Sequence, residues 1–158
     1  MNVTIYQIDP ALDEDNLIFQ NWNGFLQKGC IRPPAECYRS VYNGEMDADT
    51  TPDDVFEKFN TAIPKDYAGR SLSVSDVIEL QKAYGKSSFF FCDTFAFQEL
   101  AFEKSSALAA RVSDIPEVQR IADVVTAEYA AYKYEMCRKS GTEVYAKAYE
   151  IHLVEEIV

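Results

Sequence analysis

The sequence changes character about two thirds of the way along, and this change constrains the fold more than any other feature. Up to residue 101, short runs of alternating apolar and polar residues are separated by Gly, Pro, Asn and Asp, which is typical of β-strands joined by turns. From residue 102 onward the chain is rich in Ala, Glu, Lys and Arg, and Pro116 and Gly141 fit helix boundaries. We therefore expect an α+β domain over residues 1–101 and a helical hairpin over residues 102–158.

The first domain is expected to contain a small, mainly antiparallel sheet of about five strands, together with two helices. Thr50 or Thr51 can cap the second helix, Pro52 suits its first turn, and Gly29 suits a left-handed end to the first helix. Residues 17–19 fit either a short strand or a helix start. The pattern places strands at residues 3–8, 38–44, 73–80, 88–92 and 95–100, and helices at residues 20–28 and 52–60.

An apolar stripe runs along the expected tail helix at spacings of four and three residues. Its members are Val118, Ala122, Val125, Tyr129, Tyr132 and Met136. A break at residues 140–142 and a short last helix then predict an antiparallel hairpin. Tyr129, Tyr132 and Tyr145 are amphipathic enough for an interface, so a homodimer through these helices and packing within one chain explain the stripe equally well.

The acidic composition narrows the class of partner. The chain has 15 Lys and Arg against 26 Asp and Glu, a formal net charge of −11, which repels phosphate backbones and argues against direct nucleic-acid binding. A basic protein partner fits this charge, although ordinary solubility explains it more simply. No apolar run approaches the roughly 20 residues of a membrane span. No signal peptide is recognisable, so we expect no membrane association and a cytoplasmic protein with reduced thiols.

The sequence offers no catalytic constellation and no pattern for a cofactor. The four cysteines form no C-x-x-C pair and His152 is the only histidine, which argues against a zinc site. The acidic runs at residues 13–15 and 47–54 fit solvated loops and a helix cap better than a cation site. Cys92 lacks a histidine base within its domain, so a small buried hydrophobe is favoured over a nucleophile. The phenylalanines at residues 89–97 fit core packing better than base stacking, because few cations surround them.

Residues 70–76 concentrate hydroxyl groups around one cation and form the best candidate site. The candidate residues are Arg70, Ser71, Ser73, Ser75 and Asp76. As a functional site, they would bind an anion or a partner peptide, with Arg70 as the charged group. As a structural element, they would form the turn into a strand, in which Gly69 permits an unusual backbone angle and Asp76 pairs with Arg70. We favour the structural interpretation.

Several short motifs follow one another in a fixed order along the first part of the chain. They are Ile-Tyr-Gln at residues 5–7, Tyr-Arg-Ser-Val-Tyr at 38–42, Thr-Thr-Pro-Asp-Asp-Val-Phe at 50–56, Gly-Arg-Ser-Leu-Ser-Val-Ser-Asp-Val at 69–77 and Cys-Asp-Thr-Phe at 92–95. In this order they resemble the YodL-like domain over residues 3–100. The resemblance implies a bacterial protein encoded by a mobile element, and it implies no known catalytic residue. The tail resembles a helical domain of unknown function found in similar proteins.

Two classes of function follow from these features. The first is a non-enzymatic module that docks on another, unidentified protein, which the family setting, the acidity and the aromatic-rich sheet support. The second is an acidic decoy that mimics nucleic acid and inhibits a host DNA-binding enzyme. A decoy needs carboxylates spaced along a ridge like phosphates, and the carboxylates of this chain are dispersed in sequence. The first class is therefore favoured.

Overall fold

The structure is a computed structural model that describes residues 1–110. The expected helical hairpin, with Tyr129, Tyr132, Tyr145 and His152, lies outside the described residues, and what the sequence indicates for it stays a prediction. Within residues 1–110, no helix combines the length and the apolar character that crossing a membrane requires.

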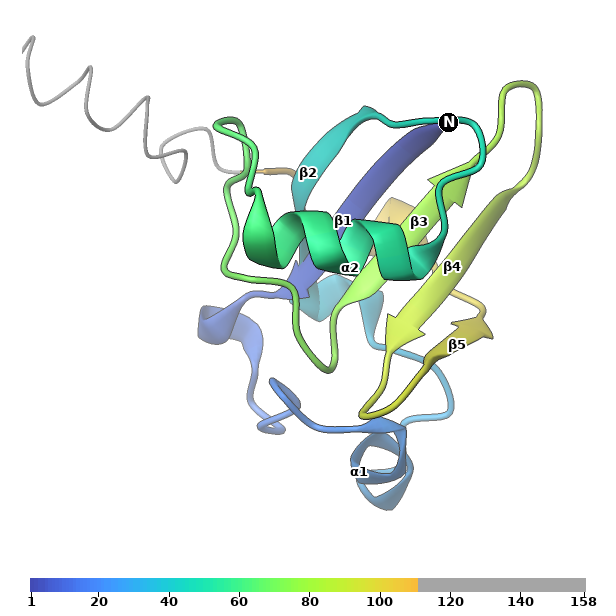
Figure 1. Ribbon diagram of the computed structural model, residues 1–158. Coiled ribbons are helices and arrows are strands. Elements are labelled where there is room, and N and C mark those ends of the chain that lie inside the picture. The colour runs from blue at the N-terminus through green and yellow to red at the C-terminus, as the bar shows by residue number, and fades with distance from the viewer. Residues whose placement is uncertain (111–158) are drawn as a thin grey trace, which may run out of the picture. The chain divides into compact units, whose positions relative to one another are not determined.

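One five-stranded sheet forms the centre of the described residues (Figure 1). Its strands lie in the order β2-β1-β3-β4-β5, and every neighbouring pair is antiparallel. The strands are β1 Asn2–Ile8, β2 Tyr38–Glu45, β3 Val77–Gln81, β4 Ser87–Cys92 and β5 Phe97–Leu100. The expected α+β class, with five antiparallel strands and two helices, is confirmed for this part of the chain.

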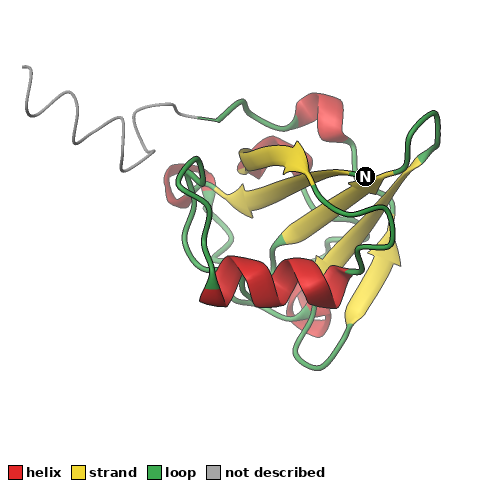
Figure 2. Cartoon of the chain, turned by 45° about the horizontal axis from the view of Figure 1, so that its top comes forward, coloured by secondary structure: helices red, strands yellow, loops and turns green. Residues whose placement is uncertain are grey.

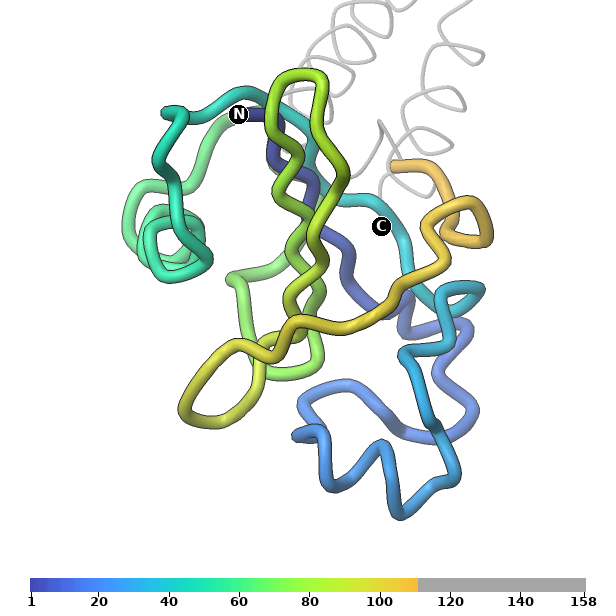
Figure 3. Tube along the Cα trace, turned by 90° about the vertical axis from the view of Figure 1, so that its right-hand side faces the viewer, coloured from blue at the N-terminus to red at the C-terminus, as the bar shows by residue number. Residues whose placement is uncertain are grey.

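Each face of the sheet carries its own apolar core. Helix α2 (Pro52–Thr61) lies on one side of the sheet and helix α1 (Trp22–Gln27) on the other, as the views in Figures 2 and 3 show. In the first core Val55 and Phe59 of α2 pack with strand residues such as Ile5. In the second core Phe25 of α1 packs with residues such as Tyr6. Alternation along β1 therefore supplies both cores, because successive side chains point to opposite faces.

Helix α2 begins at Pro52, where its sequence predicts, whereas α1 begins at Trp22, two residues after the expected start. The Thr51 hydroxyl accepts the N–H of Asp54, and the Asp54 carboxylate accepts the N–H of Thr51, so the two residues form a capping box before α2. Asn21 caps α1 by accepting the N–H of Gly24. Gly29 follows α1 with a φ of +81°, a left-handed angle that glycine adopts without steric cost.

Three further expected segments differ from the structure. The third strand begins at Val77 and not at residue 73, because residues 73–76 form a turn in which the Asp76 carboxylate accepts the N–H of Ser73. The fifth strand begins at Phe97, and Phe95 lies exposed in the hairpin loop before it. Residues 17–19 form neither a strand nor a helix, because the carboxylate of Asp13 accepts their first two backbone N–H groups.

The two edges of the sheet are covered to different degrees. At the β2 edge, the N–H of Ser40 donates to the carbonyl oxygen of Leu108 at 2.9 Å, and the N–H of Leu108 donates to that of Tyr38 at 2.8 Å. The N–H of Ala68 donates to the carbonyl oxygen of Val41 at 3.0 Å. We call this the covered edge. The other edge is β5, to which no loop of residues 1–110 adds a backbone hydrogen bond, and we call it the open edge.

Candidate functional site

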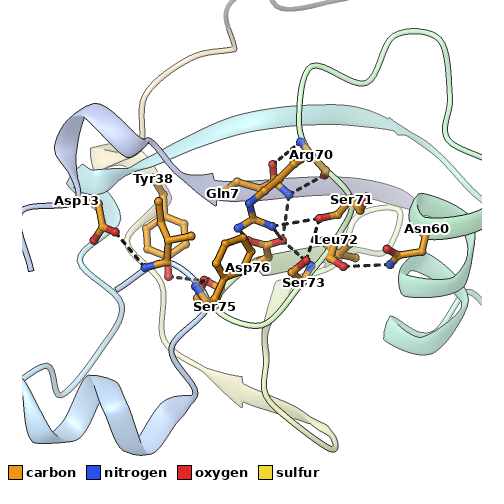
Figure 4. Close-up of polar contacts among 12 residues, drawn as sticks. Gln7, Asp13, Tyr38, Asn60, Arg70, Ser71, Leu72, Ser73, Ser75 and Asp76 are labelled. Carbon is orange, nitrogen blue, oxygen red and sulfur yellow. Dashed lines mark hydrogen bonds and ion pairs between the residues drawn. The ribbon is translucent and has the colours of Figure 1, made fainter. Parts of the chain in front are cut away.

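Asp76 lies at the centre of a buried polar cluster (Figure 4). The Arg70 guanidinium donates to both carboxylate oxygens of Asp76, from Nη2 to Oδ1 at 2.6 Å and from Nη1 to Oδ2 at 2.9 Å. The N–H of Ser73 donates to Oδ2 at 2.8 Å, and Nε2 of Gln7 lies 3.0 Å from the same oxygen. The ion pair that the structural interpretation expects is therefore present, and it is bidentate.

Gln7 of β1 connects this ion pair to the loop before it. Its Oε1 accepts the N–H of Arg70 at 3.0 Å, and its Nε2 lies 2.9 Å from the Arg70 carbonyl oxygen and 3.0 Å from the Tyr67 hydroxyl. A Cβ atom at Gly69 would lie 2.5 Å from Oε1 of Gln7 and 2.9 Å from Cγ2 of Val41. Close packing therefore requires glycine here, and the unusual backbone angle expected at Gly69 is not found, since its φ is not left-handed.

Two residues beside the ion pair adopt left-handed backbone angles that are uncommon outside glycine. The φ angle is +65° at Phe19 and +80° at Ser75, and the N–H of Phe19 donates to Oγ of Ser75 at 3.0 Å. The guanidinium carbon of Arg70 lies 4.6 Å from the centre of the Phe19 ring. Phe19 as a whole is 61% exposed. Backbone strain of this kind costs on the order of 1–3 kcal/mol per residue and clusters at binding sites.

Burial governs the protonation of the cluster. It raises the pKa of Asp76 to about 6, against the opposing effects of Arg70 and of the hydrogen bonds from Ser73 and Gln7. Burial also raises the pKa of the Tyr38 and Tyr67 hydroxyls, which keeps them as neutral donors near the carboxylate. At neutral pH the cluster is therefore an ion pair among neutral groups, and it reaches solvent through the partly exposed Arg70 side chain.

An open hollow of about 270 Å³ adjoins the ion pair, between Arg70 and a second arginine, Arg39. Arg39 donates to Oδ2 of Asp9 from Nε at 3.1 Å and from Nη2 at 2.7 Å, and its Nη1 donates to the carbonyl oxygen of Ala109 at 2.6 Å. Both arginines are thus held by buried aspartates, which fixes the two sides of the hollow.

The five candidate residues of the sequence lie together in the loop between α2 and β3, which ends in the turn at residues 73–76. The Ser71 carbonyl oxygen accepts hydrogen bonds from Nη1 of Arg70 and from the hydroxyl of Ser73. Ser75 is fully buried, and its carbonyl oxygen accepts the Tyr38 hydroxyl at 2.8 Å. Most polar groups of the turn therefore serve the fold.

Cys92 lies in the core on the α2 side, where burial raises the pKa of its thiol well above the usual value. A protonated, buried thiol fits the interpretation of Cys92 as a small hydrophobe. Within residues 1–110, no group of three His, Cys, Asp or Glu side chains is placed to hold a metal ion.

A second buried carboxylate, Glu79 of β3, was not predicted as part of a network. It accepts the Tyr6 hydroxyl at 2.9 Å, the Ser87 hydroxyl at 2.5 Å and the Lys104 ammonium at 2.6 Å. Burial opposes the charged form, but these donors lower the pKa of Glu79 overall. The network fastens the segment after β5 to the sheet.

Sequence reasoning also missed Gln7 and Phe19. One signal for Gln7 was available, because a glutamine in an apolar strand must find hydrogen-bond partners when it is buried. No comparable signal marks Phe19, since its position over Arg70 depends on a contact between segments far apart in the sequence.

A family model of the YodL-like domain matches residues 2–102. The chain belongs to the YodL-like domain family. The matched part of this YodL-like protein contains β1 to β5, α1, α2 and the Arg70–Asp76 pair, and it ends at the buried Phe102. No curated protein and no solved structure matches the chain.

Proposed function

We propose that this YodL-like protein is a non-enzymatic protein-binding module, encoded by a bacterial mobile element and active in the cytoplasm. The observation that carries the proposal is the Arg70–Phe19 pair, a guanidinium stacked on an exposed aromatic ring at the surface of a buried network. Arginine and aromatic side chains contribute most of the binding energy in many protein interfaces.

The pair is held in place before any partner binds. Arg70 is fixed by Asp76 on one side and by the Phe19 ring on the other, and the backbone of Phe19 is fixed by Ser75. A side chain that is already ordered loses less conformational entropy on binding, and this favours affinity. The buried network therefore supports both the fold and a rigid contact surface.

A second exposed aromatic residue lies in a loop joined to the same turn. Phe95 is 98% exposed in the loop between β4 and β5. The N–H of Ser75 donates to the carbonyl oxygen of Cys92 at 3.0 Å, so the turn that supports Phe19 also contacts the end of β4. Exposed aromatic side chains on loops that contact each other fit a partner surface with apolar side chains, and Arg70 beside Phe19 would bind an acceptor group of the partner.

Affinity capture from the native host with the full chain tests the proposal. We expect the Phe19→Ala variant to lose roughly tenfold or more in affinity for the captured partner, because a central aromatic contact is removed. Tyr84→Ala is the matched control, since Tyr84 is fully exposed in the β3–β4 loop at the other end of β4. Equal capture by the wild type and by a folded Phe19→Ala variant would refute the assigned surface.

The alternative function, an acidic decoy that mimics nucleic acid, stays a prediction that rests on the net charge of the sequence. Asp9, Asp76 and Glu79 are buried in ion pairs, so these three carboxylates add nothing to an exposed ridge.

A further inference from the structure

The backbone of β5 has hydrogen-bonding groups directed away from the sheet. Cys92 of β4 directs both of its backbone groups toward β3, since its N–H donates to Asp76 at 2.8 Å and its carbonyl oxygen accepts from Ser75. Phe97 pairs with Cys92 in the register, so its own N–H and C=O point outward. Glu99, two residues later, has the same orientation. Within residues 1–110, no backbone group forms a hydrogen bond with these outward N–H and C=O groups of Phe97 and Glu99.

Two hollows lie along β5, one near each end of the strand. The first, of about 370 Å³, is lined by residues that include Trp22, Phe95 and Gln98, and the second, of about 460 Å³, by residues that include Phe89, Leu100 and Phe102. Gln98 and Leu100 are two residues apart and therefore lie on the same face of the strand. If an extended chain paired with β5, every second side chain of that chain would lie on this same face, and these side chains could enter the two hollows.

The charged side chains at the β5 edge indicate which kind of ligand this edge would bind. Asp93 lines the first hollow, and Glu99 and Lys86 line the second. Glu99 is exposed on the edge strand itself, and the whole chain carries −11. Electrostatic complementarity therefore favours a basic ligand over an acidic one.

We propose that β5 accepts an extended segment of a partner protein as an additional strand. The segment carries aliphatic or aromatic side chains at alternate positions, with Lys or Arg between them. Backbone hydrogen bonds to Phe97 and Glu99 supply affinity, and the two hollows select the side chains. This inference rests on the proposed function in that both require a protein partner, and it specifies how that partner is held.

Selection from a phage-displayed library of random decapeptides, with the full chain as the target, supplies the probe. We expect selected peptides to alternate apolar and basic residues. The Glu99→Pro variant removes an outward N–H without removing a bond to β4, and it should weaken peptide binding roughly tenfold or more. Glu99→Gln removes only the charge and should weaken binding by a few-fold. Amide hydrogen exchange at Phe97 and Glu99 should slow on binding.

A selected peptide that is N-methylated at alternate residues is the matched control. It keeps the charge and the side chains but cannot pair along one edge, so it should bind far more weakly than the unmodified peptide. Equal binding by both peptides, protection at other residues, or a selection that yields no alternating sequence would overturn the proposal. If Glu99→Pro fails to fold, the N-methylated peptide still decides between the outcomes.

The two proposals fail separately. Phe19→Ala should lose the partner in affinity capture and keep the peptide, because Phe19 does not line either hollow along β5. If peptides fail to bind β5 while Phe19→Ala still loses the partner, only the strand addition is wrong.

Discussion

The two edge strands of the sheet differ in how their backbone groups are satisfied. At the covered edge, Ser40 and Tyr38 of β2 bond to Leu108, and Val41 bonds to Ala68. At the open edge, within the described residues, the outward groups of Phe97 and Glu99 have no such backbone partner. Within residues 1–110, two loop segments cover the β2 edge and none covers the β5 edge, although an unpaired edge strand exposes a protein to unwanted pairing.

The difference teaches that the covering of β2 depends on residues that lie far from this strand in the sequence. Phe102 and Lys104 fasten the segment that leads to Leu108, and the Arg70–Asp76 pair fastens the loop that contains Ala68. Hollows lie beside both edges, but backbone segments cover β2, and within residues 1–110 none covers β5. The interactions that stabilise the fold are thus concentrated at the covered edge, whereas the open edge is the more accessible of the two.

The largest expected effect comes from releasing the segment that covers β2. Phe102 is buried, and its ring centre lies 4.9 Å from that of Tyr6 and 5.4 Å from that of Tyr38. Phe102→Ala should lower the free energy of unfolding by about 3–5 kcal/mol, because it leaves a cavity beneath the sheet. Urea denaturation measures the change. The exposed Phe95→Ala is the control, with an expected change below about 0.5 kcal/mol, and equal losses in the two variants would contradict the comparison.

The next effect concerns the loop that covers β2 at Val41. Arg70→Ala leaves the buried Asp76 carboxylate without its ion-pair partner and should cost about 2–3 kcal/mol, less than a fully buried pair because Arg70 is partly exposed. The stability of Arg70→Lys should lie between that of the wild type and that of Arg70→Ala, since an ammonium cannot reproduce the bidentate contact. Thermal unfolding measures both variants. A stable Arg70→Ala protein that has lost its partner would instead assign Arg70 to binding alone.

A proline at each edge compares the two strands directly. Ser40→Pro removes the N–H that bonds to Leu108 and should cost roughly 1–3 kcal/mol. Glu99→Pro removes an outward N–H and should cost less than about 1 kcal/mol, because proline is tolerated where the N–H of an edge strand faces solvent. Chemical denaturation measures the free energy of unfolding of both variants. A larger loss of stability for Glu99→Pro than for Ser40→Pro would show that the open edge is covered after all.

The smallest effect is a dependence on pH. Since burial raises the pKa of Asp76 to about 6, above its unfolded value, the native state takes up a proton before the unfolded state does. The wild type should therefore gain roughly 1 kcal/mol relative to Asp76→Asn between pH 7 and pH 5, and lose it again as the pH rises through 6. Stability curves of the two proteins test the sign. A wild type that loses stability relative to Asp76→Asn on acidification would show that Arg70 outweighs burial.

Local patterns predicted much of this fold. Alternation located β1, a hairpin pattern located β4, and a capping threonine followed by Pro52 located the start of α2. The third strand was extended too far because Val74, like Ile78, fits an apolar strand position, whereas the Asp76 carboxylate accepts the N–H of Ser73 and holds residues 73–76 in a turn. The contacts of Gln7 with Arg70 and of Leu108 with Tyr38 join distant segments, so no window of sequence contains them. The candidate turn was located correctly, but its relation to Phe19 required the fold.

The position of β1 inside the sheet sets an order of assembly. Both neighbours of β1 are synthesised after it, and the pairing of Asn2 with Gln81 requires most of the domain to have been made. Contacts between residues so far apart slow folding, since the intervening chain must be ordered first. During translation the apolar residues of β1 are therefore exposed for longer than those of any later strand, and in this interval a chaperone would compete with the sheet for them.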